Sequence, residues 1–132
     1  MFKITPIQDI TRQKEVCLAC GVEFKSGTFA YQMFDIESEE IMGMCQFEIG
    51  EHGYIYDLRP ALNTDDFEAM FILGRQTMNF IDLCGVHTCY ANLNAGDERL
   101  LRAIGFKETD GKLFCNMKGM FDGNCSGHKV EL

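Results

Sequence analysis

A long amphipathic helix between two strand-like segments is the feature that most limits how this chain can fold. Residues 65–83 repeat large apolar side chains at helical spacing, which predicts a helix with one apolar face; these side chains are Phe67, Met70, Phe71, Met78 and Ile81. Residues 54–58 before the helix and 86–93 after it have the composition of strands. Because an apolar helix face must be buried, this order predicts an α/β domain with the helix packed on a sheet.

Capping and turn residues place the ends of the helices. Asn63 or Thr64 is expected to cap the long helix, and Gly85 lies just past its end. Asp9 and Gly21 enclose a shorter helix in the same way. This pattern predicts a mixed, mostly antiparallel sheet flanked by helices. The expected strands are residues 2–7, 28–35, 41–49, 54–58, 86–93 and 112–120, and the expected helices are residues 10–20, 65–83 and 97–104.

The length and the cysteines bound the class of protein. A chain of 132 residues fits one domain, which we assign to residues 1–121, and residues 122–132 are expected to form a loose tail because they have two Gly and little apolar content. Charged residues interrupt the N-terminal segment, and no apolar run reaches the ~18 residues of a membrane span. We therefore expect a cytoplasmic protein whose seven cysteines are reduced.

Negative charge is concentrated in one part of the chain. The net charge is −8, which argues against binding to nucleic acids or membrane surfaces because both are anionic. Residues 26–58 contain no Lys or Arg, but they contain seven acids: Asp35, Glu37, Glu39, Glu40, Glu48, Glu51 and Asp57. This segment is either a solvated strand surface or part of a cleft that attracts a cationic amine.

The second half of the chain carries a spaced pattern of Pro, Asn and Gly-Phe. Pro60 follows the strand before the long helix, Asn94 follows the strand after it, and the next short helix ends in Gly105-Phe106. With this spacing, residues 41–119 resemble the GNAT superfamily of N-acetyltransferases. The resemblance implies the GNAT acyl-CoA N-acyltransferase fold, acetyl-CoA as the cofactor, and transfer of the acetyl group to a small amine without a metal.

The resemblance also implies where the site lies. The strand before the long helix would carry acetyl-CoA on its backbone, and the residues expected to bind the cofactor are Tyr56, Leu58, Arg59, Asn63, Thr64 and Asn94. A general base must take a proton from the amine. Asp57 and Glu51 are the catalytic candidates by position, with Glu48 nearby; the alternative is that all three are surface carboxylates.

Two positions depart from the family pattern. Where the family has a glycine-rich turn for pyrophosphate, this chain has Asn63-Thr64-Asp65-Asp66-Phe67-Glu68. Carboxylates stabilise a helix start by ~0.3–1 kcal/mol each, but they repel an anion bound there. Leu101 stands where many family members have a tyrosine that protonates the leaving thiolate, and Leu has no proton to donate.

Two hypotheses of function stay open, and a homodimer is compatible with both. The first is an acetyl-CoA-dependent N-acetyltransferase acting on a small amine. The second is a non-catalytic GNAT-like domain that has lost pyrophosphate binding and serves in binding or oligomerisation. Cys17 with Cys20, and Cys125 with His128, have zinc-ligand spacing, but the pairs lie at opposite ends of the chain, which argues against a metal site.

Overall fold

One seven-stranded sheet organises the molecule. The computed structural model describes residues 1–121, and the expected tail at residues 122–132 lies outside them. The strand order across the sheet is β1-β2-β3-β4-β5-β7-β6, and all neighbours are antiparallel except β4 and β5. The strands are β1 (Phe2–Pro6), β2 (Phe29–Asp35), β3 (Ile41–Ile49), β4 (Gly53–Pro60), β5 (Thr88–Ala91), β6 (Lys107–Thr109) and β7 (Lys112–Asn116).

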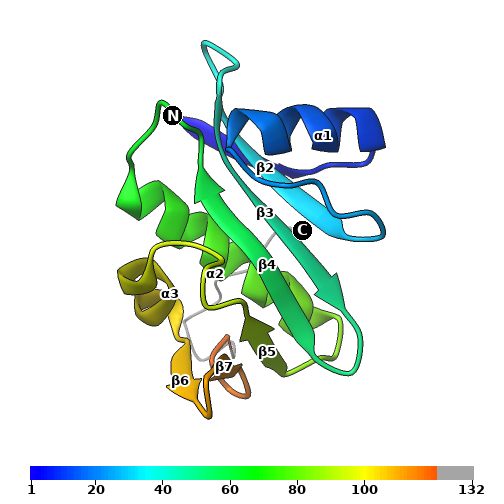
Figure 1. The fold of residues 1–132 in the computed structure, drawn as a ribbon, viewed down its shortest axis with the longest axis vertical. Coiled ribbons are helices and arrows are strands. Elements are labelled where there is room, and N and C mark those ends of the chain that lie inside the picture. The colour runs from blue at the N-terminus through cyan, green and yellow to red at the C-terminus, as the bar shows by residue number, and fades with distance from the viewer. Residues whose placement is uncertain (122–132) are drawn as a thin grey trace.

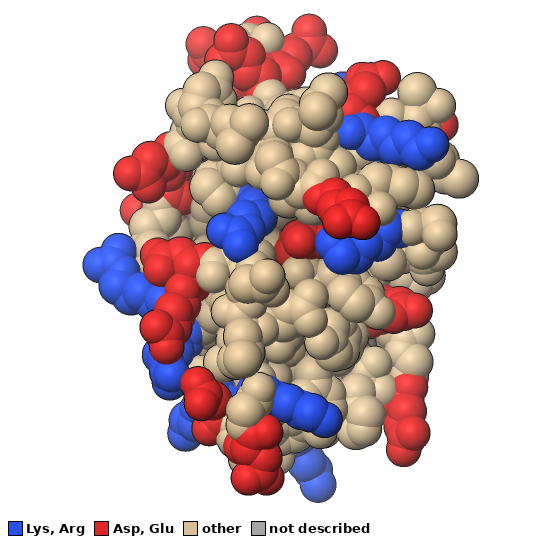
Figure 2. All heavy atoms as spheres, in the orientation of Figure 1, with Lys and Arg blue, Asp and Glu red and all other residues tan. Residues whose placement is uncertain are grey.

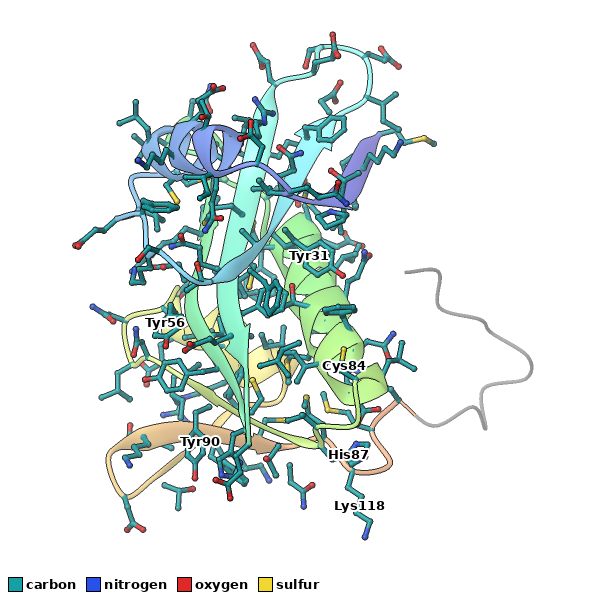
Figure 3. All side chains as sticks on the ribbon, turned by 90° about the vertical axis from the view of Figure 1, so that its right-hand side faces the viewer. Tyr31, Tyr56, Cys84, His87, Tyr90 and Lys118 are labelled. Atoms are coloured by element: carbon teal, nitrogen blue, oxygen red, sulfur yellow. The ribbon has the colours of Figure 1, made fainter. Side chains whose placement is uncertain are left out.

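Within residues 1–121, three helices cover the sheet, and α1 and α2 lie on opposite faces (Figures 1 and 3). They are α1 (Ile10–Ala19), α2 (Phe67–Leu83) and α3 (Glu98–Ile104). The main core lies between the sheet and α2 with α3, while a smaller core fills the space under α1. Figure 1 shows that α1 covers the β2–β3 end of its face, so no helix of residues 1–121 lies over the β5 and β7 end of that face. The mixed, mostly antiparallel α/β sheet expected from the sequence is confirmed.

An aspartate caps each helix. Asp9 and Asp97 accept hydrogen bonds from Thr11 N and Arg99 N at the starts of α1 and α3. The expected cap of α2, Asn63 or Thr64, is wrong: the cap is Asp66, whose Oδ1 accepts from Ala69 N at 3.0 Å. The helix therefore begins at Phe67, two residues later than expected, because residues 61–64 form a turn closed by a Thr64 N to Ala61 O bond.

The C-terminal strands differ most from expectation. The expected strand at residues 112–120 is shorter, at Lys112–Asn116, and it pairs with β6, which was not expected. Asp110 and Gly111 both have positive φ, at 52° and 76°, which is the geometry of a type I′ hairpin turn. This Asp-Gly pair was the available signal for the extra strand. The expected strand at 86–93 shortens to Thr88–Ala91 because the chain turns away at Asn92.

No helix within residues 1–121 combines the length and the apolar character that a membrane crossing needs.

Candidate functional site

The two parallel strands β4 and β5 diverge after a short paired region. They pair only at Gly53, Tyr54 and Ile55 of β4. Beyond this point β5 ends at Ala91, while β4 continues to Pro60. The divergence leaves the outer half of β4 without a strand partner on its β5 side.

The segment 92–96 fills the part of the opening next to β4. The Leu58 amide donates to the Ala95 carbonyl oxygen at 2.7 Å, and the Asn92 amide donates to the Ile55 carbonyl oxygen at 3.1 Å. Arg59 adds a bond from Nη2 to the Asn94 carbonyl oxygen at 2.5 Å. The backbone groups that a strand partner would use on β4 are therefore partly occupied by the chain itself.

Gly96 is the closest point of this contact. A Cβ placed on Gly96 would lie 2.4 Å from the Leu58 carbonyl oxygen, which belongs to rigid strand backbone. We therefore expect Gly96→Ala to destabilise the fold by about 1–3 kcal/mol, measured by urea denaturation. Gly50→Ala is the matched control, since nothing lies within 4 Å of a Cβ at that position. Equal stability of the two variants would show that segment 92–96 is not held against β4.

An open pocket of about 620 Å³ lies beside this contact, and we call it the Asp57 pocket. Three segments line it: the loop after α1, the outer half of β4 with the turn that follows, and the segment after β5. Its walls include Cys20, Lys25, Asp57, Arg59, Thr64, Asn92 and Asn94. Figure 2 shows that acidic and basic side chains lie next to each other in the middle of the face that carries α1.

A β-bulge turns the Asp57 side chain toward this pocket. Gln46 pairs with Asp57 but Phe47 pairs with Ile55, so Tyr56 is an extra residue in β4. Ile55 and Leu58, both fully buried, consequently lie three positions apart instead of two. The bulge leaves both Tyr56 and Asp57 off the core face, where a regular strand would expose one residue.

Asp57 is held by one cation and one amide. Its Oδ2 accepts from Lys25 Nζ and from Gln46 Nε2, each at 2.8 Å, and its side chain is 14% exposed. Both bonds use the same oxygen, so Oδ1 has no hydrogen-bond partner among the described residues. A carboxylate fixed at one oxygen and free at the other can accept a proton from a ligand in the pocket.

Gln46 connects Asp57 to α1 and to the loop that follows it. It is fully buried, and its Oε1 accepts from Gln13 Nε2 at 2.9 Å, Lys25 N at 3.2 Å and Cys17 Sγ at 3.4 Å. Its Nε2 donates to Glu23 O at 3.1 Å as well as to Asp57. Both ends of this amide are used, which fixes the position of Asp57 and of the Lys25 backbone.

The two cysteines beside the site are poor nucleophiles. Burial, with a smaller contribution from Asp57, raises the pKa of Cys17 to about 11. Burial also raises the pKa of Cys20, which lines the pocket, to about 12. Because the thiolate is the reactive form, a thiol-based reaction at neutral pH is disfavoured here. Within residues 1–121, no group of three or more His, Cys, Asp or Glu side chains could hold a metal, and Cys125 and His128 lie outside this range.

Solved structures of known proteins share the architecture of this chain, although no sequence comparison finds a match. No protein-family model and no curated protein matches the amino-acid sequence. Among solved structures, the ribosomal-protein-S18-alanine N-acetyltransferase from Escherichia coli matches with a TM-score of 0.66 and 11% identity, covering 89% of this chain and 94% of that one. An N-acetyltransferase from Staphylococcus aureus Mu50 matches with a TM-score of 0.64 and 14% identity, covering 89% of this chain and 99% of the other.

A third structure is the PaiA N-acetyltransferase from Thermoplasma acidophilum in complex with coenzyme A. It has a TM-score of 0.59 and 10% identity, and the match covers 85% of this chain and 96% of that one. The chain has the GNAT fold. At sequence identities this low, the structural similarity shows the fold alone. The order of helices and strands along the sequence had already indicated this fold.

The GNAT fold separates the residues expected at the site into two pockets. Asp57, Arg59, Thr64 and Asn94 line the Asp57 pocket together. Tyr56 and Glu51 line a different pocket at the β3–β4 turn. Leu58 is fully buried and its amide is bonded to Ala95, while Asn63 is exposed and lines neither pocket.

Three residues of the site were missed from the sequence: Lys25, Gln46 and Asn92. Lys25 is the last basic residue before the cation-free segment 26–58, and that position was a usable signal. Asn92 accepts from Tyr54 Oη at 2.6 Å and donates to the Tyr56 carbonyl oxygen at 3.4 Å, so it connects the chain just after β5 to the first half of β4. Asn94, which was expected to bind the cofactor, lines the Asp57 pocket and accepts a hydrogen bond from Arg59 with its carbonyl oxygen.

The two departures from the GNAT sequence pattern, at residues 63–68 and at Leu101, can each be located in the structure. Asp66 caps α2 with its carboxylate, Glu68 lies in the first turn, and Asp65 and Asp66 line a small pocket with Asp97 at the start of α3. Negative charge therefore occupies the positive end of the α2 dipole. Leu101 is fully buried in the main core, where its side chain packs against other apolar groups.

Proposed function

We propose that the Asp57 pocket binds an acyl-CoA thioester, with acetyl-CoA as the first candidate, and transfers its acyl group to a small amine. The observation that carries the proposal is the fixed Asp57 carboxylate, with one free oxygen, in an open pocket between two diverging parallel strands. The GNAT fold supports it, since the structural neighbours reported above are N-acetyltransferases and one of them holds coenzyme A.

The proposed reaction uses groups that are already in the pocket. Asp57 Oδ1 takes a proton from the ammonium form of the amine, and the free amine attacks the thioester carbonyl carbon. The new C–N bond forms as the C–S bond breaks, the CoA thiolate leaves, and the nitrogen that has gained the acyl group loses its second proton to solvent water in the open pocket. The leaving thiolate needs a proton that Leu101 cannot give, and the Lys25 ammonium is the pocket group that supplies it. Lys25 is then neutral beside Asp57, which returns a proton to it.

Thioesters with and without the pyrophosphate provide the direct test. Saturation at ~100 times Kd stabilises a protein by about 2.7 kcal/mol, which a thermal-shift measurement detects. We expect acetyl-CoA and S-acetyl-pantetheine both to stabilise the chain and to support acetylation of added alkylamines. If neither thioester shifts the melting temperature at millimolar concentration, the proposal is wrong.

A non-catalytic GNAT-like module is the second candidate function. Two observations favour it: the acids at the start of α2 oppose a bound pyrophosphate, and segment 92–96 bonds to the β4 backbone that would hold the cofactor arm. In this case neither thioester would bind and no acyl transfer would occur. The thioester measurements therefore distinguish the two candidates without further assumptions.

Neutralising the acids near the start of α2 should improve binding of acetyl-CoA. Asp65→Asn with Glu68→Gln removes two negative charges and leaves the Asp66 cap intact. Charges at a helix start are worth about 0.3–1 kcal/mol each, so we expect a three- to thirtyfold lower Kd for acetyl-CoA, measured by isothermal titration. S-acetyl-pantetheine is the internal control, since it has no pyrophosphate and its Kd should not change. An equal change for both ligands would contradict an electrostatic effect on the pyrophosphate.

A further inference from the structure

A second pocket lies at the turn between β3 and β4. It is open, has a volume of about 340 Å³, and is formed by the end of β3, the β3–β4 turn, the first half of β4, and Tyr90 of β5. Its lining contains Tyr54, Tyr56 and Tyr90, three of the four tyrosines in the chain. We call it the tyrosine pocket.

The strand geometry brings the three rings to one face of the sheet. Tyr54 and Tyr56 are two positions apart in β4, and Tyr90 is the register partner of Tyr54 on β5. The Tyr54 and Tyr56 ring centroids are 4.7 Å apart. Figure 3 shows Tyr56 and Tyr90 on the α1 side of the sheet, whereas Tyr31, the fourth tyrosine, lies on the α2 side. Among residues 1–121, the helix on this side of the sheet is α1, and it lies over the β2–β3 end.

The side chains that line the tyrosine pocket include two carboxylates, which give it negative charge. Glu48 and Glu51 line it, and no Lys or Arg among residues 1–121 does. Neither glutamate makes an ion pair with a basic residue in the part of the chain that the structure describes. Glu48 accepts a hydrogen bond from Tyr56 Oη, so its charge is held beside the rings.

The surroundings of Tyr90 bear on the kind of group that these rings accept. Lys112 from β7 already lies with Nζ 5.9 Å from the Tyr90 ring centroid, at the edge of cation–π range. His52 and Tyr90 form a T-shaped pair with centroids 5.3 Å apart and planes at 87°, and the Phe114 ring centroid lies 5.0 Å from that of Tyr90, so neighbouring rings hold Tyr90 in place. Aromatic faces with unpaired carboxylates beside them attract cations that also carry apolar surface, because both parts of such a ligand are satisfied.

We propose that the tyrosine pocket binds a small organic cation of the alkylammonium class. The tyrosine faces contact the alkyl groups around the charge, and Glu48 and Glu51 supply the opposite charge. Both glutamates belong to the segment 26–58, which has no Lys or Arg. The inference does not depend on acyl transfer, since it requires neither a thioester nor the Asp57 pocket.

Choline and its neutral carbon analogue 3,3-dimethylbutan-1-ol are the probes. The chain has no Trp, so its intrinsic fluorescence comes from tyrosine, and three of its four tyrosines line the pocket. We expect choline to change this fluorescence saturably and the neutral alcohol to leave it unchanged. Similar saturable changes with both probes would overturn the role of charge, and no saturable change with choline would overturn the site.

Single substitutions measure separately what the tyrosine rings and the carboxylates contribute to choline binding. Tyr90→Leu removes one aromatic face and should raise the Kd for choline about two- to fivefold, as expected for an exposed cation–π contact. Glu51→Gln removes a charge without changing shape and should raise the Kd by a similar factor. Tyr31→Phe and Glu37→Gln are the matched controls, because Tyr31 is buried on the α2 side and Glu37 lies in the β2–β3 turn.

The control variants should bind choline as the unchanged chain does. Glu51→Gln is an exposed, isosteric change, so its circular dichroism and melting temperature should also stay unchanged, and it remains informative if Tyr90→Leu folds poorly. Unaltered choline binding in both pocket variants would assign the signal to another site and refute the proposal.

Discussion

Gln46→Leu is expected to destabilise the protein by about 3–5 kcal/mol, close to the largest effects seen for single substitutions. Leu has nearly the same volume as Gln, so the change removes five hydrogen bonds without opening a large cavity. It leaves the Gln13 amide and the Glu23 carbonyl oxygen without these bonds, and it takes one of two donors from Asp57. Each buried polar group that loses its partner costs about 1–3 kcal/mol.

Urea denaturation of Gln46→Leu beside Gln8→Leu measures this cost. Gln8 is exposed and makes none of these bonds, so the same chemical change there should alter stability by less than about 0.5 kcal/mol. A destabilisation below about 1 kcal/mol for Gln46→Leu would mean that water replaces the amide, and that Asp57 is not held by this network.

The elements that could be predicted from the sequence are those whose signals are local. The long helix, the β2–β3 hairpin and the aspartate cap of α1 follow from apolar spacing and from single capping residues. The predicted start of α2 was wrong because several polar residues precede the helix. Which of them caps it depends on the turn at residues 61–64. The extra strand β6 was missed although Asp110-Gly111 gives a turn signal, because three exposed residues carry no apolar pattern.

The candidate site could be predicted only in part, because its contacts join residues far apart in the chain. Asp57 was singled out by its place late in a strand, but its partners Lys25 and Gln46 come from a loop and from the neighbouring strand. The bulge that turns Asp57 outward depends on the register of β3 against β4, which no local pattern shows. Glu51 was grouped with Asp57 by sequence proximity, yet the turn carries it to the tyrosine pocket.

The hydrogen bonds of Asp57 indicate which of its oxygens is held by the protein and which is left to take part in the proposed reaction. Lys25 and Gln46 both bind Oδ2, so they orient the carboxylate and leave Oδ1 toward a ligand. A basic residue that lies beside a carboxylate in a pocket can give up a proton during the reaction and take a proton back from that carboxylate afterwards. Removing the carboxylate charge should therefore affect chemistry more than binding of the thioester, which contacts other parts of the pocket.

Asp57→Asn is accordingly expected to lower kcat/KM for acyl transfer about 10²- to 10⁴-fold, the usual contribution of a general base. Asn keeps the shape and can still accept from Lys25 and Gln46, so the Kd for S-acetyl-pantetheine should change little. The matched control is Asp82→Asn, a largely buried carboxylate in α2 that pairs with His87 outside both pockets. Its kcat/KM should match that of the unchanged chain. If Asp57→Asn and Asp82→Asn turn over equally fast, Asp57 is not the base, and the fixed carboxylate serves only the stability of the loop after α1, through Lys25 and Gln46.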